Sequence, residues 1–183
     1  MHNELEHKKL LIDEMGRKTV EEYKAAQKTP IVVVLDNIRS LNNVGSIFRT
    51  CDGMLIEKIV LAGITSTPPN NEIHKTALGA ELSVDWEYFD DTHEALARLR
   101  GQGYTLCCIE QTHNSIMLND FRIDDDKKYA LVLGNEVKGV QQSVVDMCDC
   151  CIEIPQFGIK HSFNVAVTAG IVLWELFSQR LKK

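Results

Sequence analysis

The short run Ile31–Leu35 (IVVVL), apolar throughout and mostly β-branched, constrains the fold of this chain more than any other feature. A strand made of such a run has no polar face, so it is expected to be buried on both sides of a sheet. Similar runs recur at 58–62, 104–109, 130–133 and 151–154. We therefore expect strands at all five places, inside a sheet whose two faces are both covered.

Segments with a helical spacing of apolar residues separate these strands. We expect helices at about 44–53, 91–100, 141–147 and 164–183. Asp91 or Thr92 suits the N-cap of the second helix. Alternating strands and helices are typical of an α/β fold with a mostly parallel sheet between two helical layers. Folds of this class bind ligands beyond the carboxyl ends of their strands.

The first 29 residues differ from the rest of the chain. Acidic and basic residues alternate there with sparse apolar positions, which predicts one or two surface helices interrupted near Gly16. The pattern of buried strands begins at Pro30. We therefore divide the chain into an N-terminal helical extension, 1–29, and a single α/β domain, 30–183, which is long enough for a substantial core.

Composition narrows the cellular setting and the choice of partners. The chain has no apolar run long enough to span a membrane, and its charged N-terminus is unlike a signal peptide, so we expect a cytoplasmic protein. Cys148, Cys150 and Cys151 lack a second ligand pair at zinc spacing, so we expect reduced thiols and no metal. The net charge of −6 predicts that any contacts with nucleic acid are confined to a local basic patch.

The stretch after the first strand, 36–50, holds two arginines and three asparagines. We expect Arg39 in the loop, Asn43 near the beginning of the next helix and Arg49 one to two turns into that helix. Asparagine amides both donate and accept hydrogen bonds, and an arginine fork matches a pair of phosphate oxygens. The group therefore suits a ribose-phosphate backbone. The alternative is structural: the asparagines would cap helices and the arginines would form surface ion pairs. For Arg39 the binding role and the structural role are equally well supported.

Two later loops also follow predicted strands. The stretch 134–139 (GNEVKG) places a carboxylate and an amide between glycines, which let a backbone approach a ligand closely, but it equally suits a tight turn. In the stretch 155–164, Pro155 and Gly158 restrict and bend the chain. Ser162 or Asn164 then caps the last helix, whose N-terminal amides would be available to a ligand.

Three stretches, Asn43–Thr50 (NVGSIFRT), Leu133–Gly139 (LGNEVKG) and Ile154–Ala166 (IPQFGIKHSFNVA), resemble the signature motifs of the SpoU family in order and separation. This SpoU-type (TrmH-like) family of the SPOUT superfamily consists of RNA 2′-O-ribose methyltransferases. The resemblance implies that 30–183 is a methyltransferase domain, with S-adenosylmethionine as cofactor and RNA as substrate. It also implies a deep trefoil knot near the C-terminus and a homodimer, with the last helix as an interface element or packed on the sheet.

The resemblance also assigns individual residues. Those implied to line the cofactor site are Leu133, Gly134, Asn135, Glu136, Gly139, Ile154, Pro155, Gly158, Ser162 and Phe163. Those implied to be catalytic are Asn43, Arg49, Glu136, Ser162 and Asn164. Phe163 stands where the family commonly has leucine, and Gly45 departs from the first motif in a way expected to weaken a helix start. A guanidinium almost never loses its proton, so we interpret Arg49 as a clamp that stabilises alkoxide charge rather than as a base.

The kind of RNA is less constrained than the reaction. Relatives modify tRNA or large-subunit rRNA, and we lean slightly towards tRNA. The chain shows no separate RNA-binding domain, so we expect the catalytic dimer to do most of the recognition. A catalytically inactive protein that binds RNA or the cofactor is one alternative. A small-molecule methyltransferase is another, favoured only by the acidic balance of the sequence.

Overall fold

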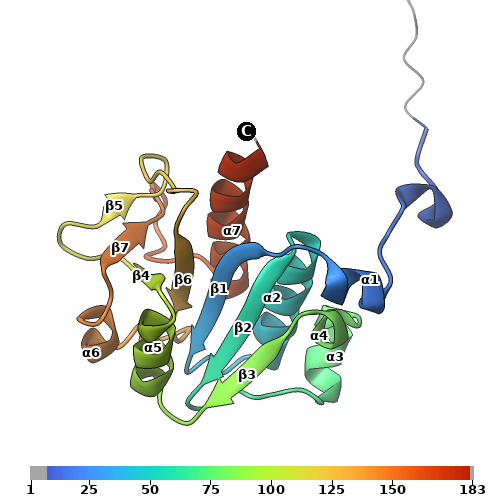
Figure 1. Ribbon diagram of the computed structural model, residues 1–183. Helices are drawn as coiled ribbons and strands as arrows, with labels where there is room; N and C mark the ends of the chain where they lie inside the picture. The colour runs from blue at the N-terminus through green and yellow to red at the C-terminus, as the bar shows by residue number, and fades with distance from the viewer. Residues whose placement is uncertain (1–7, 182–183) are drawn as a thin grey trace, which may run out of the picture.

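The computed structural model describes residues 8–181, and its centre is a seven-stranded sheet in the order β3-β2-β1-β6-β4-β7-β5 (Figure 1). All neighbouring strands run parallel. The strands are β1 (Thr29–Asp36), β2 (Ile56–Ala62), β3 (Trp86–Phe89), β4 (Tyr104–Ile109), β5 (Ile116–Met117), β6 (Lys128–Leu133) and β7 (Cys150–Glu153). The predicted α/β class and the parallel sheet are confirmed.

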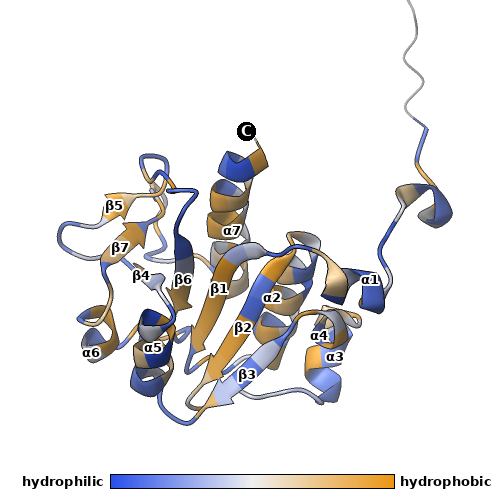
Figure 2. Cartoon of the chain, viewed as in Figure 1, coloured by the Kyte–Doolittle hydropathy of each residue, from blue (hydrophilic) through white to orange (hydrophobic). Residues whose placement is uncertain are grey.

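Helices cover both faces of the sheet. One layer holds α2 (Leu41–Gly53), α3 (Asn71–Ala77), α4 (Ala80–Ser83) and α7 (Val165–Leu181), and the other holds α5 (Thr92–Gly101) and α6 (Gln142–Val145). In β1, Ile31, Val33 and Leu35 pack against the first layer, whereas Val32 and Val34 pack against the second. Two apolar environments explain why residues 31–35 of the strand include no polar side chain, and most of β1 is accordingly coloured hydrophobic in Figure 2.

The N-terminal segment leads away from the body of the molecule (Figure 1). It forms a short 3-10 helix (Ile12–Met15) and the helix α1 (Val20–Ala25), and between them Gly16 has a φ of 57°. This agrees with the predicted surface helices broken near Gly16, although residues 3–7 of that prediction lie outside the described part. No helix within residues 8–181 is long and apolar enough to cross a membrane.

Four elements were absent from the sequence prediction. β3 is an edge strand that pairs only with β2, and its sequence WEYF mixes polar and aromatic residues, so it shows no apolar run. β5 has two residues, and α3 and α4 are one to two turns long, too short for a clear periodic pattern. The alternative N-caps of α5 are resolved in favour of Asp91, whose carboxylate accepts a hydrogen bond from the His93 N–H.

Gly45 allows two helices to pack closely. A Cβ atom at this position of α2 would lie 2.2 Å from both the backbone oxygen of Ile73 and the hydroxyl of Thr76 in α3. Contacts this short do not occur in folded proteins, so α3 fits against α2 only because residue 45 has no side chain. The glycine that was expected only to weaken the start of α2 therefore sets the packing of the helix beside the first motif.

Candidate active site

Four loops meet at the carboxyl edge of the sheet. They follow β1, β6, β4 and β7, which are consecutive neighbours in the strand order. The chain leaves β1 towards α2 in one helical layer and leaves β6 towards α6 in the other. Such a divergence between adjacent strands opens a crevice, where parallel α/β folds bind their ligands. The second and third motifs lie on loops at this edge, and the first motif lies in α2, which begins at the end of the loop after β1.

The loop after β6 is a tight hairpin. The backbones of Asn135 and Gly139 exchange two hydrogen bonds of 3.1 and 2.9 Å, and the side-chain oxygen of Asn135 accepts from the N–H groups of Val137 and Lys138. A Cβ at Gly134 would lie 2.3 Å from the carbonyl carbon of Gly139, so the two arms touch backbone to backbone. The glycines of this motif are thus required by close packing of the hairpin itself.

Glu136, inside this hairpin, joins it to the loop after β1. Its carboxylate accepts hydrogen bonds from the backbone N–H of Arg39 at 3.0 Å, from that of Ser40 at 2.9 Å and from the side-chain amide of Asn43 at 3.0 Å. Burial by itself raises the pKa of Glu136, but these hydrogen bonds outweigh it and the pKa lies below its ordinary value. The side chain is therefore a carboxylate at neutral pH.

Asn43 extends this connection to the third motif. Its side-chain oxygen accepts a 3.1 Å hydrogen bond from the amide of Asn164, while its nitrogen donates to Glu136. The oxygen of Asn164 accepts from the backbone N–H groups of Ala166 and Val167, which caps α7. The structure thus links three predicted catalytic residues, one from each motif, in a single chain of hydrogen bonds.

A cavity of about 550 Å³ lies beside this chain of hydrogen bonds. That volume falls within the range of about 300–1,000 Å³ that is usual for small-molecule sites. Of the predicted cofactor-site residues, those that line the cavity are Leu133, Gly134, Asn135, Glu136, Gly139, Ile154, Ser162 and Phe163. Pro155 and Gly158 are not in its lining, although both belong to the loop that borders it. Asn164 also lines the cavity, whereas Asn43 and Arg49 do not.

Ser162 and Arg49 are the two predicted catalytic residues outside the hydrogen-bonded chain. Ser162 is exposed on the loop after β7 and faces the cavity. Arg49 is exposed on α2, and within residues 8–181 its guanidinium makes no hydrogen bond or ion pair. Both side chains are therefore accessible to a ligand rather than committed to the fold.

Two residues that line the cavity, both in the loop after β4, were not among the predicted site residues. Glu110 and Gln111 line the cavity, and each makes a hydrogen bond to one of the motif loops. The detectable signal was two polar residues directly after the buried run 104–109, the same signal that marked the other loops. The first and third motifs were easier to notice because they carry several unusual residues each.

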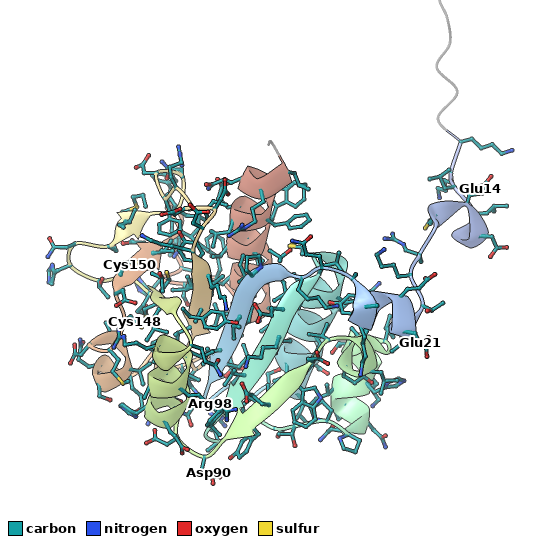
Figure 3. The ribbon with its side chains drawn as sticks, viewed as in Figure 1. Glu14, Glu21, Asp90, Arg98, Cys148 and Cys150 are labelled. Carbon is teal, nitrogen blue, oxygen red and sulfur yellow. The ribbon has the colours of Figure 1, made fainter. Side chains whose placement is uncertain are left out.

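The cysteines near β7 serve packing. Cys148 and Cys150 lie close to the start of that strand (Figure 3), and the sulfur atoms of Cys150 and Cys107 are 3.4 Å apart across the β4–β7 pair. All six cysteines are free thiols. Among the residues that the structure describes, no group of three or more histidine, cysteine or acidic side chains is arranged to hold a metal ion.

Comparison with known proteins identifies the family. The sequence model of the SpoU rRNA methylase family matches residues 30–174. A tRNA (guanosine(18)-2′-O)-methyltransferase from Thermus thermophilus is 31% identical over 171 residues, which make up 92% of this chain and 85% of that protein. The region matched by the family model, 30–174, includes all three motif stretches, so their resemblance to the SpoU signature is confirmed.

Solved structures agree with the sequence match. The crystal structure of the TrmH/SpoU tRNA modifying enzyme of Aquifex aeolicus has a TM-score of 0.77 and 27% identity, covering 89% of this chain and 81% of that one. An AdoMet-bound rRNA methyltransferase from Sinorhizobium meliloti also has a TM-score of 0.77, with 26% identity, and covers 87% of this chain and 60% of that one. On sequence and fold together, this chain belongs to the SpoU rRNA methylase family.

Proposed function

We propose that this protein transfers the methyl group of S-adenosylmethionine to a ribose 2′-hydroxyl of RNA. The observation that carries the proposal is the chain of hydrogen bonds from Glu136 through Asn43 to Asn164 beside a cavity of about 550 Å³. One residue from each family motif takes part in it. The relatives named as tRNA and rRNA methyltransferases support the same reaction.

The cavity suits the cofactor. S-adenosylmethionine supplies a methyl group on a positively charged sulfur atom. The hairpin after β6 presents backbone at Gly134, where a side chain cannot fit, and the carboxylates of Glu110, Glu136 and Glu153 give the lining a negative balance that favours a cation. The residues we propose to hold the cofactor are Leu133, Gly134, Asn135, Glu136, Gly139, Ile154, Pro155, Gly158, Ser162 and Phe163.

Unpaired cations surround the site and suit RNA phosphates. The side chains of Arg39, Arg49, Lys138 and Lys160 are exposed, and none has a hydrogen-bond or ion-pair partner within residues 8–181. In contrast, the arginines of α5 are neutralised: Arg98 (Figure 3) pairs with Glu87, and Arg100 pairs with Asp149. A protein of net charge −6 thus keeps free positive charge on the motif loops, which supports phosphate binding there.

We assign the following roles to the catalytic residues. Arg49 holds a phosphate of the RNA and stabilises negative charge that develops on the attacking 2′-oxygen. Asn43, Glu136 and Asn164 fix the three motif loops relative to one another, which keeps the reacting groups aligned. Ser162 presents its hydroxyl to the cavity. Positioning and charge stabilisation together lower the barrier without a guanidinium that acts as a base.

We further infer a homodimer, a trefoil knot and the domain division at residue 30. The apolar side chains of Phe157, Ile159, Val167 and Trp174 are exposed on the last loop and α7, which supports their burial against a second copy. The hydrogen bond between Gln111 and His161 joins the last loop to the loop after β4, and this closeness of the two loops supports the knot. Residues 1–29 would then form an extension to the methyltransferase domain, 30–183.

We favour tRNA as the substrate and the cytoplasm as the place of action. The match with the Thermus tRNA enzyme, which extends over 92% of this chain, supports tRNA. Six free thiols suit a reducing compartment.

The decisive test is incubation with methyl-labelled S-adenosylmethionine and either total tRNA or purified rRNA. We expect label in tRNA. Label in rRNA alone would show that rRNA, and not tRNA, is the substrate. If neither RNA is labelled although the protein binds the cofactor, an enzymatic role is contradicted.

A further inference from the structure

The loop after β4 contacts both loops that border the cofactor cavity, although no family motif includes it. Glu110 and Gln111 are the first two residues beyond the strand. β4 lies between β6 and β7 in the sheet, so its carboxyl end lies between the hairpin 134–140 and the loop 155–164. A residue at this end of β4 can therefore hold both loops at once.

Glu110 holds the hairpin. One carboxylate oxygen accepts a 3.1 Å hydrogen bond from the backbone N–H of Val140, and the other accepts from the N–H of Gln111 at 2.9 Å. The oxygen that bonds Val140 would lie 2.3 Å from a Cβ at Gly139. The carboxylate thus packs directly on the glycine that closes the hairpin, where no larger residue fits.

Gln111 holds the loop 155–164. Its side-chain amide donates a 2.7 Å hydrogen bond to the backbone oxygen of His161. No other hydrogen bond joins residues 156–163 to the rest of the described chain. Packing within one copy of the chain adds little, because Phe157 and Ile159 are 98% and 94% exposed there. The contact from Gln111 therefore tethers the middle of a loop whose end is fixed separately, by the hydrogen bond between Asn164 and Asn43.

The loop after β4 is itself anchored. The backbone N–H of Glu110 donates to the oxygen of Ile152 at 3.2 Å, and the hydroxyl of Ser115 donates to the Glu153 carboxylate at 2.6 Å. Both acceptors belong to β7. Glu110 and Gln111 thus act from a fixed position on the sheet, which is what a positioning role requires.

We propose that Glu110 and Gln111 are positioning residues, which hold the hairpin 134–140 and the loop 155–164 at the separation that S-adenosylmethionine needs. Because the cavity is a cofactor site only under the proposed function, this role rests on that proposal. A site held in its binding geometry loses less conformational freedom when the ligand binds. Loss of either residue is therefore expected to weaken cofactor binding more than it affects the chemical step or the RNA.

The test uses Glu110→Gln and Gln111→Ala in the full chain. A glutamine at position 110 has only one oxygen for the two N–H donors, so we expect the Kd for S-adenosylmethionine, measured by calorimetry, to rise about 10-fold or more. For Gln111→Ala we expect a rise of about 3- to 10-fold. The KM for the cofactor should rise in parallel, while kcat at saturating cofactor and the KM for RNA stay within about 2-fold of wild type.

Two controls separate positioning from general damage. Glu94→Gln and Gln102→Ala change exposed side chains of α5 and of its C-cap, neither of which has a hydrogen-bond or ion-pair partner within residues 8–181, so both should bind the cofactor like wild type. Without cofactor, trypsin should cut after Lys160 faster in Gln111→Ala than in Gln102→Ala, because the tether at His161 is lost. This proteolysis reports on the loop even if the proposed function is wrong.

The possible outcomes are distinct. If the wild-type protein binds the cofactor and both variants bind it with the same Kd, the positioning role is overturned and the proposed function stays intact. Wild-type protein that does not bind S-adenosylmethionine would overturn both. If kcat falls and the KM for RNA rises by as much as the Kd for the cofactor rises, the two residues maintain the whole fold rather than the cofactor site.

Discussion

The side-chain amide of Asn43 donates a 3.0 Å hydrogen bond to the carboxylate of Glu136, which joins the helix after β1 to the hairpin after β6. The two residues are 93 positions apart in the sequence. They meet because β1 and β6 are neighbours in the sheet and both strands end at the same edge. Two motifs of the family thus form one unit of structure, and the loss of either partner affects both.

Glu136 should stabilise the fold as well as the site. Glu136→Ala removes the acceptor of three hydrogen bonds, from Arg39, Ser40 and Asn43. We expect the free energy of unfolding in urea to fall by about 2 kcal/mol. Glu94→Ala, on an exposed face of α5, should change it by about 0.5 kcal/mol or less. Equal effects of the two substitutions would show that the three hydrogen bonds contribute nothing to stability.

Stability should depend on pH through the same carboxylate. Burial raises the pKa of Glu136 and the hydrogen bonds lower it more, so its folded-state pKa lies below the value of about 4.3 for an unfolded glutamate. A group whose pKa is lower in the folded state stabilises the fold at pH values above its unfolded-state pKa. This contribution is lost as the pH falls through the folded-state pKa. Between pH 6 and pH 3 the free energy of unfolding should therefore fall more steeply for wild type than for Glu136→Gln. Parallel curves would contradict the assigned hydrogen bonds.

Arg49 should matter for transfer and not for folding. Its guanidinium is exposed and unpaired within residues 8–181, and it lies outside the cavity lining, so Arg49→Ala should leave the unfolding midpoint and the Kd for S-adenosylmethionine unchanged. Methyl transfer in single-turnover assays should slow about 100-fold or more, because charge stabilisation at the reacting oxygen is lost. Arg49→Lys should restore only part of the rate, since lysine lacks the fork. Near wild-type transfer by Arg49→Ala would refute the clamp.

Gly134 should tolerate no side chain. A Cβ there would lie 2.3 Å from both the carbonyl carbon of Gly139 and the nitrogen of Val140, so Gly134→Ala must separate the arms of the hairpin. We expect calorimetry to give a Kd for S-adenosylmethionine that is at least about 10-fold higher. Gly170→Ala is the matched control: nothing lies within 4 Å of a Cβ there, and alanine is the better residue inside α7. Unchanged binding in Gly134→Ala would mean that the hairpin adapts freely.

Much of this architecture could be predicted from the sequence because its central strands are apolar on both faces. Ile31–Leu35 lies in the interior of the sheet, between β2 and β6, so it has the unbroken apolar run that reveals such a strand. β3 lies at the edge, where exposed faces permit polar residues, and its pattern disappears. Strand order could not be predicted, because it depends on contacts between residues that are far apart in the chain, as between β1 and β6.

The site shows the same division between local and distant information. Motifs placed Asn43, Glu136 and Asn164 at strand ends, but their mutual hydrogen bonds depend on the strand order. Gly45 illustrates the limit most clearly. Its role is to leave room for Ile73 in another helix, and nothing in the sequence around residue 45 indicates that neighbour.

The most direct test of the central claim is the alkali stability of RNA labelled by this protein. A 2′-O-methyl group blocks cleavage of the adjacent phosphodiester bond by the 2′-oxygen, whereas a methyl group on a base does not. After transfer from methyl-labelled S-adenosylmethionine to tRNA and hydrolysis in alkali, we predict that the label is recovered in dinucleotides that resist cleavage. Recovery of the label in mononucleotides would contradict ribose methylation.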